Sequence, residues 1–128
     1  MSTKSRGINA ERDLIHKFWA QGWAAMRAAG SGSSQFPSPD VIASNNVRKI
    51  ALECKLTTKT RQYFSKDEVR LLTYFCAKFG AEPWLAVKFF HEPWYFFPIE
   101  NAEETKSSYV ISLERAKSLG MLFEELVE

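Results

Sequence analysis

Three acidic residues and a lysine follow one another along the 128-residue chain in an order that suits metal-dependent phosphodiester hydrolysis. They are Glu11, Asp40 and the outer residues of the tripeptide Glu53-Cys54-Lys55. Hard cations such as Mg²⁺ prefer carboxylate oxygens and keep several water molecules. A metal ion held by Asp40 and Glu53 would lower the pKa of a bound water and offset charge on the attacked phosphate. Lys55 would orient that water or stabilise negative charge in the transition state.

The middle of the chain, which holds most of these residues, has the pattern of a β-hairpin. Two runs rich in branched apolar residues, 39–43 and 50–55, flank a pair of asparagines that favour a turn. Because side chains alternate along a strand, Glu53 and Lys55 would share the face opposite the core residues. A surface ion pair is the simpler interpretation of a Glu-X-Lys sequence alone, and the other two carboxylates weigh against it.

Glu11 belongs to a stretch with helical periodicity. Apolar residues recur at helical spacing through residues 10–21, which predicts a helix with Asn9 as its N-cap and Gly22 as its stop. Glu11 lies on the apolar stripe, where burial of an unpaired carboxylate is costly. The alternative is that Glu11 complements the helix dipole in the first turn. Residues 1–7 would form a basic arm.

A glycine- and serine-rich stretch, residues 29–35, comes shortly before the Pro39-Asp40 dipeptide. A plain linker is one interpretation of such a composition. Because the stretch is short and lies within one domain beside the candidate site, a mobile active-site loop is the interpretation that we favour.

The remaining segments alternate between strand and helix patterns. A capping box formed by Ser65 and Glu68 predicts a helix that ends at Gly80, and residues 57–62 have the polar, basic composition of a phosphate-binding segment. Further strands are expected at 23–27, 84–89, 94–98 and 109–113, and a helical segment with a break at Gly120 at 114–128. This order predicts one α/β domain over residues 1–128, with a mixed central sheet flanked by helices on both faces.

Composition bounds the possible classes of protein. The chain is 45% hydrophobic, which is enough for a core, and no segment approaches the roughly 20 apolar residues that span a bilayer. The N-terminus lacks the apolar stretch of a secretory signal. Cys54 and Cys76 show no metal-ligand spacing and are typical of reduced cysteines in an intracellular protein. We therefore expect a cytoplasmic protein without membrane contact.

Charge is unevenly distributed along the chain. Residues 1–70 hold twelve Lys and Arg and six Asp and Glu, a net charge of +6, whereas residues 71–128 have a net charge of −4. The basic half also contains the candidate site, so its cations would neutralise phosphates around that site. An ordinary solvated surface is the alternative.

The ordered combination of Glu11, Pro39-Asp40 and Glu53-X-Lys55 resembles the nuclease superfamily named for its Pro-Asp…Asp/Glu-X-Lys motif. More narrowly, the chain resembles the archaeal-type Holliday junction resolvases up to about residue 100. The matching pieces include Arg6-Gly7, Ala10-Glu11-Arg12, Gly22-Trp23-Ala24, Arg27-Ala28, Gly30-Ser31-Gly32-Ser33, Pro39-Asp40-Val41-Ile42-Ala43, Phe79-Gly80 and Leu85-Ala86-Val87-Lys88-Phe89.

The resemblance implies a restriction-endonuclease-like core and roles for particular residues. Lys55 would be the catalytic lysine, and Ser31 would lie on a mobile loop near the scissile phosphate. The implied metal-site residues are Glu11, Asp40, Glu53 and Cys54. The resemblance implies that Arg12 and Arg27 bind DNA or shape the site. The basic half of the chain adds Arg6, Lys59 and Arg61 as candidate DNA-binding residues.

The resemblance also implies a cofactor and an assembly. Mg²⁺ would be the metal, with Mn²⁺ able to replace it, and a homodimer would cut opposing strands of a four-way DNA junction. Phe75 and Phe79 would contribute to the dimer interface. Many members of the superfamily carry a glutamine where this chain has Glu68, which leaves the role of Glu68 open. Another repair or restriction endonuclease, or a non-catalytic DNA-binding accessory protein, are the alternative functions.

Overall fold

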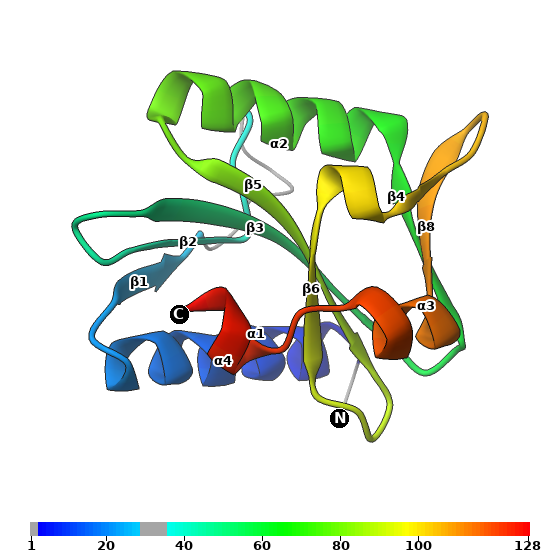
Figure 1. Cartoon of the computed structure of the whole chain (residues 1–128), viewed down its shortest axis with the longest axis horizontal. Coiled ribbons are helices and arrows are strands. Elements are labelled where there is room, and N and C mark those ends of the chain that lie inside the picture. The colour runs from blue at the N-terminus through cyan, green and yellow to red at the C-terminus, as the bar shows by residue number, and fades with distance from the viewer. Residues whose placement is uncertain (1–2, 29–35) are drawn as a thin grey trace.

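The computed structural model describes residues 3–28 and 36–128 (Figure 1), so Ser31 and the predicted loop at 29–35 lie outside the described residues. The elements in chain order are α1 (Thr3–Ala20), β1 (Ala24–Arg27), β2 (Val41–Ser44), β3 (Lys49–Thr57), β4 (Arg61–Ser65), α2 (Lys66–Phe79), β5 (Glu82–Phe89), β6 (Trp94–Pro98), the 3-10 helix η2 (Ile99–Asn101), β7 (Glu103–Glu104), β8 (Ser108–Ser112), α3 (Leu113–Leu119) and α4 (Phe123–Leu126).

A five-stranded mixed sheet of order β1-β2-β3-β5-β6 forms the centre of the molecule. Only β3 and β5 pair in parallel, and the other neighbours in this sheet are antiparallel. Helix α2 covers one face, and α1 and α4 cover the other (Figure 1). The predicted α/β class with helices on both faces is confirmed. The second sheet, of order β4-β8-β7, was not predicted.

The first helix begins earlier than the sequence pattern indicates. It starts at Thr3, so the predicted basic arm at 1–7 and the predicted N-cap at Asn9 are wrong for the described part of that segment. Lys and Arg favour helices, and the single Gly7 costs only about 1 kcal/mol in a helix interior. The helix therefore continues upstream of its buried stripe.

The predicted hairpin is confirmed. Strands β2 and β3 pair antiparallel, with Val41 opposite Leu52. In the turn, the Asn45 side-chain oxygen accepts hydrogen bonds from two backbone amides, and Asn46 has a left-handed φ of 79°. Asparagine tolerates this conformation better than most residues, which explains why the asparagine pair marks the turn.

Both faces of β3 are buried, which corrects the prediction that Glu53 and Lys55 lie opposite the core. Ile50 and Leu52 pack beneath α1, while Ala51, which is 0% exposed, packs beneath α2. The reason is that β3 is the central strand of a sheet covered on both faces. Glu53 and Lys55 therefore follow Ala51 along a core-facing side of the strand.

The polar segment predicted at 57–62 forms the turn between two strands and parts of both strands. Strand β3 continues to Thr57, and β4 starts at Arg61 and pairs with β8. Phe64, in the middle of β4, is fully buried. The partner strand is almost fifty residues away, and such long-range pairing overrides weak local strand propensity.

Helix α2 starts and ends where the sequence predicts. The Ser65 hydroxyl accepts a hydrogen bond from the Glu68 amide, and the Glu68 carboxylate accepts one from the Ser65 amide. Gly80 ends the helix with a φ of 81°. Phe79, the last residue of the helix, is 46% exposed and stacks on Phe75. Among the described residues, no helix is long and apolar enough to cross a bilayer.

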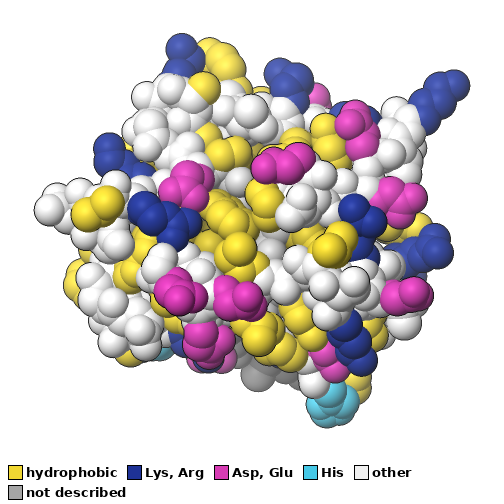
Figure 2. All heavy atoms as spheres, viewed as in Figure 1, with side chains coloured by type: hydrophobic (Ala, Val, Ile, Leu, Met, Phe, Trp, Pro, Cys, Tyr) yellow, Lys and Arg dark blue, Asp and Glu magenta, His cyan; other side chains and the backbone are white. Residues whose placement is uncertain are grey.

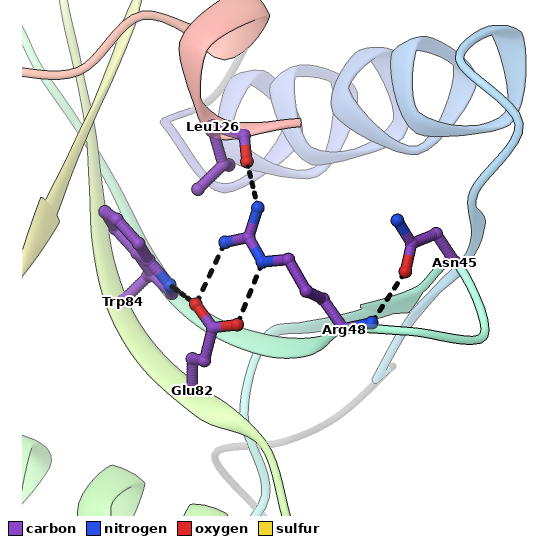
Figure 3. A network of polar contacts seen from close by, with 5 residues as sticks. All are labelled: Asn45, Arg48, Glu82, Trp84 and Leu126. Carbon is purple, nitrogen blue, oxygen red and sulfur yellow. Dashed lines mark hydrogen bonds and ion pairs between the residues drawn. The ribbon is translucent and has the colours of Figure 1, made fainter. Parts of the chain in front are cut away.

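Arg48 fastens the C-terminal segment to the central sheet (Figure 3). Its guanidinium donates two hydrogen bonds of 2.9 Å to the Glu82 carboxylate and one of 2.7 Å to the Leu126 carbonyl. Trp84 also donates to Glu82, and the guanidinium lies 5.6 Å above the Trp23 ring. One side chain thus joins the β2–β3 hairpin, β5 and α4.

We expect Arg48→Met to lower the free energy of unfolding by about 1–2 kcal/mol, because several hydrogen bonds to charged groups are lost together. The hydrogen bond from Arg48 lowers the pKa of Glu82, so the stabilisation is present above the ordinary value of 4.5 and is lost as the pH falls below it. Urea titrations at several pH values measure both effects. Arg70→Met, which removes an exposed pair with Asp67, is the control and should change stability little.

Candidate active site

Asp40 is held rigidly at the point where β2 begins. Its backbone amide donates to the Leu52 carbonyl and its carbonyl accepts from the Ala28 amide, at 3.0 and 2.9 Å. Its carboxylate oxygen Oδ2 accepts a 2.8 Å hydrogen bond from the Cys54 amide. Both the backbone and the side chain of Asp40 are therefore fixed against β3.

Glu53 faces Asp40 from the adjacent strand. Burial raises the pKa of Glu53 to about 8, and the charges of Asp40 and Glu68 and a hydrogen bond with Asp40 act in the same direction. The Lys55 ammonium opposes this rise. Two carboxylates in this contact repel each other when both are ionised, so the pair favours an added proton or another cation between them.

Glu11 approaches the same place from α1, on the other face of the sheet. Burial and the charge of Asp40 raise the pKa of Glu11, and a 2.9 Å ion pair with Arg27 opposes the rise. The two side chains of this pair are only 18% and 19% exposed. Arg27 therefore shapes the site through Glu11 in this conformation, which agrees with one of its two implied roles.

Cys54 contributes main-chain atoms to the site. Burial raises the pKa of its thiol well above the ordinary value, and the charges of Asp40, Glu11 and Glu53 add to the rise. A neutral thiol packed against the α1 core is a poor metal ligand. The amide and carbonyl of a strand residue point to the same edge, so the Cys54 carbonyl faces the Asp40 side along with its amide.

Lys55 is oriented by Glu68 and Phe64, and neither contact was predicted from the sequence. Its ammonium pairs with Glu68 Oε2 at 2.9 Å and lies 5.5 Å from the centre of the Phe64 ring. The other oxygen of Glu68 accepts from the Ser65 amide. Burial alone would raise the pKa of Glu68, but the hydrogen bond from Ser65 and the pairing with Lys55 lower it. Glu68 thus points into the site, and its carboxylate stays ionised.

The oxygen atoms gathered at this site could supply some of the ligands that a hard divalent cation needs. Within residues 3–28 and 36–128, no three Asp, Glu, Cys or His side chains gather at metal-binding separations. Mg²⁺ is often held by one or two carboxylates and several waters, which Asp40, Glu53 and the Cys54 carbonyl can satisfy. Since Arg27 engages Glu11, a direct place for Glu11 on the metal stays a prediction.

The predicted DNA-binding cations on α1 and after β3 are exposed to solvent. Arg12 is exposed on α1, immediately after Glu11, and Arg6 is exposed one to two turns earlier on the same helix. Lys59 and Arg61 are exposed around the turn between β3 and β4. By contrast, acidic side chains gather over the region of α4 on the face seen in Figure 2, where DNA would be repelled.

The raised pKa of Glu53 predicts how stability depends on pH without a divalent metal. Folded Glu53 holds a proton up to about pH 8, whereas the unfolded chain releases it near 4.5, so ionisation favours unfolding. The stabilisation from this proton is complete at a pH below the pKa of Glu53 in the unfolded chain. It is lost as the pH rises through the pKa of Glu53 in the folded protein. Between about pH 5 and pH 8 the wild type should therefore lose melting temperature relative to Glu53→Gln. If the melting temperatures of the two proteins changed equally with pH, this expectation would be wrong. Added Mg²⁺ should reduce the difference in melting temperature between the two proteins.

The family model and the related sequences all identify the same protein family. The family model described as "Archaeal holliday junction resolvase (hjc)" matches residues 2–128. The crossover junction endodeoxyribonuclease Hjc of Archaeoglobus fulgidus is 41% identical over 95% of this chain and 95% of its own length. The corresponding Hjc of Methanocaldococcus jannaschii is 33% identical over 95% of this chain and 86% of its own.

A solved structure agrees with these sequence matches. The Archaeoglobus fulgidus Hjc, a Holliday junction resolvase from an archaeal hyperthermophile, superposes with a TM-score of 0.88. Its sequence is 38% identical, and the match covers 95% of this chain and all of that one. The similarity therefore extends over nearly the whole fold and includes the elements that carry Asp40, Glu53 and Lys55.

Proposed function

This chain belongs to the archaeal Holliday junction resolvase family, and we propose that it is an endodeoxyribonuclease that resolves four-way DNA junctions by paired, symmetric nicks. The observation that carries the proposed site is the contact of the Asp40 and Glu53 carboxylates beside the oriented ammonium of Lys55. Resolvases named as crossover junction endodeoxyribonucleases, 41% and 33% identical, support the choice of substrate.

Asp40, Glu53 and the Cys54 carbonyl would hold the divalent metal that nucleases of this kind generally use, with Glu11 as an additional ligand or as the partner of Arg27. Bound Mg²⁺, or Mn²⁺ in its place, would supply a water of lowered pKa and positive charge toward the phosphate. Asp40 is suited to this role because the Cys54 amide fixes its carboxylate before any ligand arrives.

Lys55 would stabilise the negative charge that develops on the attacked phosphate. Its pairing with Glu68 keeps the ammonium in one place, so little reorganisation is needed during the reaction. Ser31, on the segment outside the described residues, is proposed to donate a hydrogen bond to the same phosphate.

The exposed cations around the site would hold the DNA backbone. Arg6 and Arg12 on α1, and Lys59 and Arg61 after β3, supply exposed positive charge on or beside the elements that carry Glu11 and Glu53. Each phosphate contact adds about one unit to the slope of log affinity against log salt. A protein that acts on chromosomal DNA is expected to work in the cytoplasm, at the nucleoid.

Incubation of the purified protein with a four-way junction, a nicked duplex and a linear duplex, with and without Mg²⁺, tests the proposal. We expect metal-dependent nicks in opposing junction strands and little cleavage of the linear duplex. Cleavage of linear duplex at a fixed sequence would indicate a restriction-type nuclease instead. Junction binding without cleavage under any divalent metal would indicate an accessory protein.

We also propose that the protein is a homodimer. Large hydrophobic side chains are exposed along one side of the molecule, including Trp19, Met26, Phe36, Tyr74 and Phe79. Two hollows of about 380 and 470 Å³ lie on this side, and Phe79 lines both of them. Contiguous apolar surface of this kind marks a protein interface, and a two-fold dimer would present two sites to the two strands of a junction.

Phe79→Ser is expected to convert the dimer to monomers, because Phe79 links the two hollows and contributes little to the core. Sedimentation velocity at micromolar protein measures the change. Leu119→Ser, which alters an equally exposed apolar side chain on α3, is the control and should leave a dimer. Wild-type protein that sediments as a monomer while it cuts both junction strands in one encounter would refute the dimer.

A further inference from the structure

A further hollow, of mixed chemistry, lies beside the candidate active site. Its volume is about 240 Å³, and it is enclosed by the first part of α1 and the carboxyl ends of β3 and β5. The lining includes cations, hydroxyls and aromatic rings, together with one carboxylate, Asp13; the members used below are Arg6, Thr57, Thr58, Phe90 and His91. Cations, hydroxyls and an aromatic wall together suit a nucleotide, which has a phosphate, a sugar and a flat base.

Two elements, α1 and β3, lead from the candidate site to this hollow. Ala10, which lines it, directly precedes Glu11 on α1. Thr57, which also lines it, is two residues beyond Lys55 on β3, roughly 7 Å along the strand. That span is about two base-pair steps of a duplex. A DNA strand cut beside Lys55 would therefore pass this hollow within two nucleotides of the cut.

Phe90, whose side chain lines the hollow, is 60% exposed, whereas the neighbouring Phe89 is buried. It begins the turn between β5 and β6, which lies at one edge of the molecule (Figure 1). The Phe90 ring lies 3.9 Å from the His91 ring, centre to centre. The protein thus displays two adjacent rings at the mouth of a basic hollow instead of burying them.

The turn that carries these rings is firmly braced. The Phe90 amide donates to the Thr57 carbonyl and the Glu92 amide to the Phe89 carbonyl, each at 3.0 Å. Lys88 donates to the Glu92 carbonyl, and Tyr95 donates to the Glu92 carboxylate. His91 adopts a φ of 61°, which a histidine accepts more readily than most residues. Phe90 is therefore presented in a defined place at little further cost of ordering on binding.

We propose that Phe90 stacks on a nucleobase at the branch point of the junction, while Arg6 and the threonine hydroxyls face the adjoining sugar and phosphate. Arms that meet at a branch expose base faces that a continuous duplex keeps stacked between neighbours. Every base has a π-face, so stacking on an aromatic side chain tolerates any sequence. The contact would thus select branched over linear DNA without base-specific hydrogen bonds. This inference rests on the proposed junction-cleaving function and adds a determinant of its selectivity.

Affinity measurements without divalent metal test the inference on a junction with 2-aminopurine beside the branch and on a linear duplex. Phe90→Ala and Phe90→Leu should weaken junction binding about tenfold and leave duplex binding unchanged, since stacking on one base contributes roughly 1–3 kcal/mol. Phe90→Tyr should restore both the affinity and the stacking-dependent fluorescence change. Leu119→Ser, which alters an exposed apolar side chain outside this hollow, is the control and should bind both DNAs as the wild type does.

The outcomes separate this inference from the proposed function. Wild-type protein that neither cuts junctions nor prefers them to duplex would overturn the proposed function and the stacking contact with it. Wild-type protein that prefers and cuts junctions, together with Phe90→Ala of unchanged affinity and fluorescence, would overturn the stacking contact alone. Equal losses on junction and duplex would also overturn it, because they would assign Phe90 to general DNA binding.

Discussion

Asp40→Asn is expected to abolish junction cleavage while junction affinity stays within a few-fold of wild type. The asparagine oxygen can still accept the hydrogen bond from the Cys54 amide, so the backbone around the site should be preserved. The charge that would hold the metal is lost, and several kcal/mol of metal-derived stabilisation corresponds to a rate loss of about a thousandfold or more. Affinity should not suffer, because one fewer carboxylate repels the phosphates.

Single-turnover cleavage and junction binding, measured on the same preparation, give the two quantities. Asp67→Asn is a matched control, since Asp67 is an exposed carboxylate in the first turn of α2 and lies outside the proposed site. It should cut junctions at the wild-type rate. Cleavage by Asp40→Asn at the wild-type rate in Mg²⁺ would end the proposal that Asp40 holds the metal.

Lys55→Met is expected to reduce single-turnover cleavage by about a hundredfold to a thousandfold, the usual loss when one group that stabilises transition-state charge is removed. Lys55→Arg should recover little of this activity, because a planar, forked guanidinium does not replace a compact ammonium between Glu68 and the Phe64 ring. Melting temperatures check that both variants are folded.

Glu68→Gln separates the two tasks of the Glu68 carboxylate. Glutamine also serves in a capping box, so α2 should keep its N-terminal cap and its stability. The ion pair with Lys55 becomes a neutral hydrogen bond, so cleavage should fall less than in Lys55→Met. A Glu68→Gln variant as inactive as Lys55→Met would show that the carboxylate itself takes part in the chemistry.

The parts of the fold that local sequence determines were predicted well. The asparagine turn, the capping box at Ser65 and the stop at Gly80 each depend on a few neighbouring residues, and all three are confirmed. The start of α1 was predicted wrongly, and strand β4 was not predicted. Strand β4 depends on pairing with β8. Helix α1 lacks a clear N-terminal signal in the sequence, and its buried stripe begins at Ala10.

In the candidate site, too, local contacts could be predicted from the sequence and contacts between distant elements could not. The approach of Asp40 to Glu53 follows from a short hairpin whose register the apolar pattern sets, so the sequence could indicate it. The pairing of Lys55 with Glu68 and of Glu11 with Arg27 joins separate elements. The packing of α2 and α1 on the sheet determines these contacts, and no spacing along the chain encodes them.

Helix α2 connects Lys55, the proposed catalytic lysine, to the proposed subunit contact as a stiff rod. Its 14 residues extend about 21 Å. Glu68 in its first turn holds Lys55, and Phe79 at its last residue borders the exposed apolar side. Neither end can tilt far without moving the other, so a partner subunit seated against Phe79 would also set the angle at which Lys55 meets the DNA. Monomeric variants would then lose alignment within each site as well as the second site.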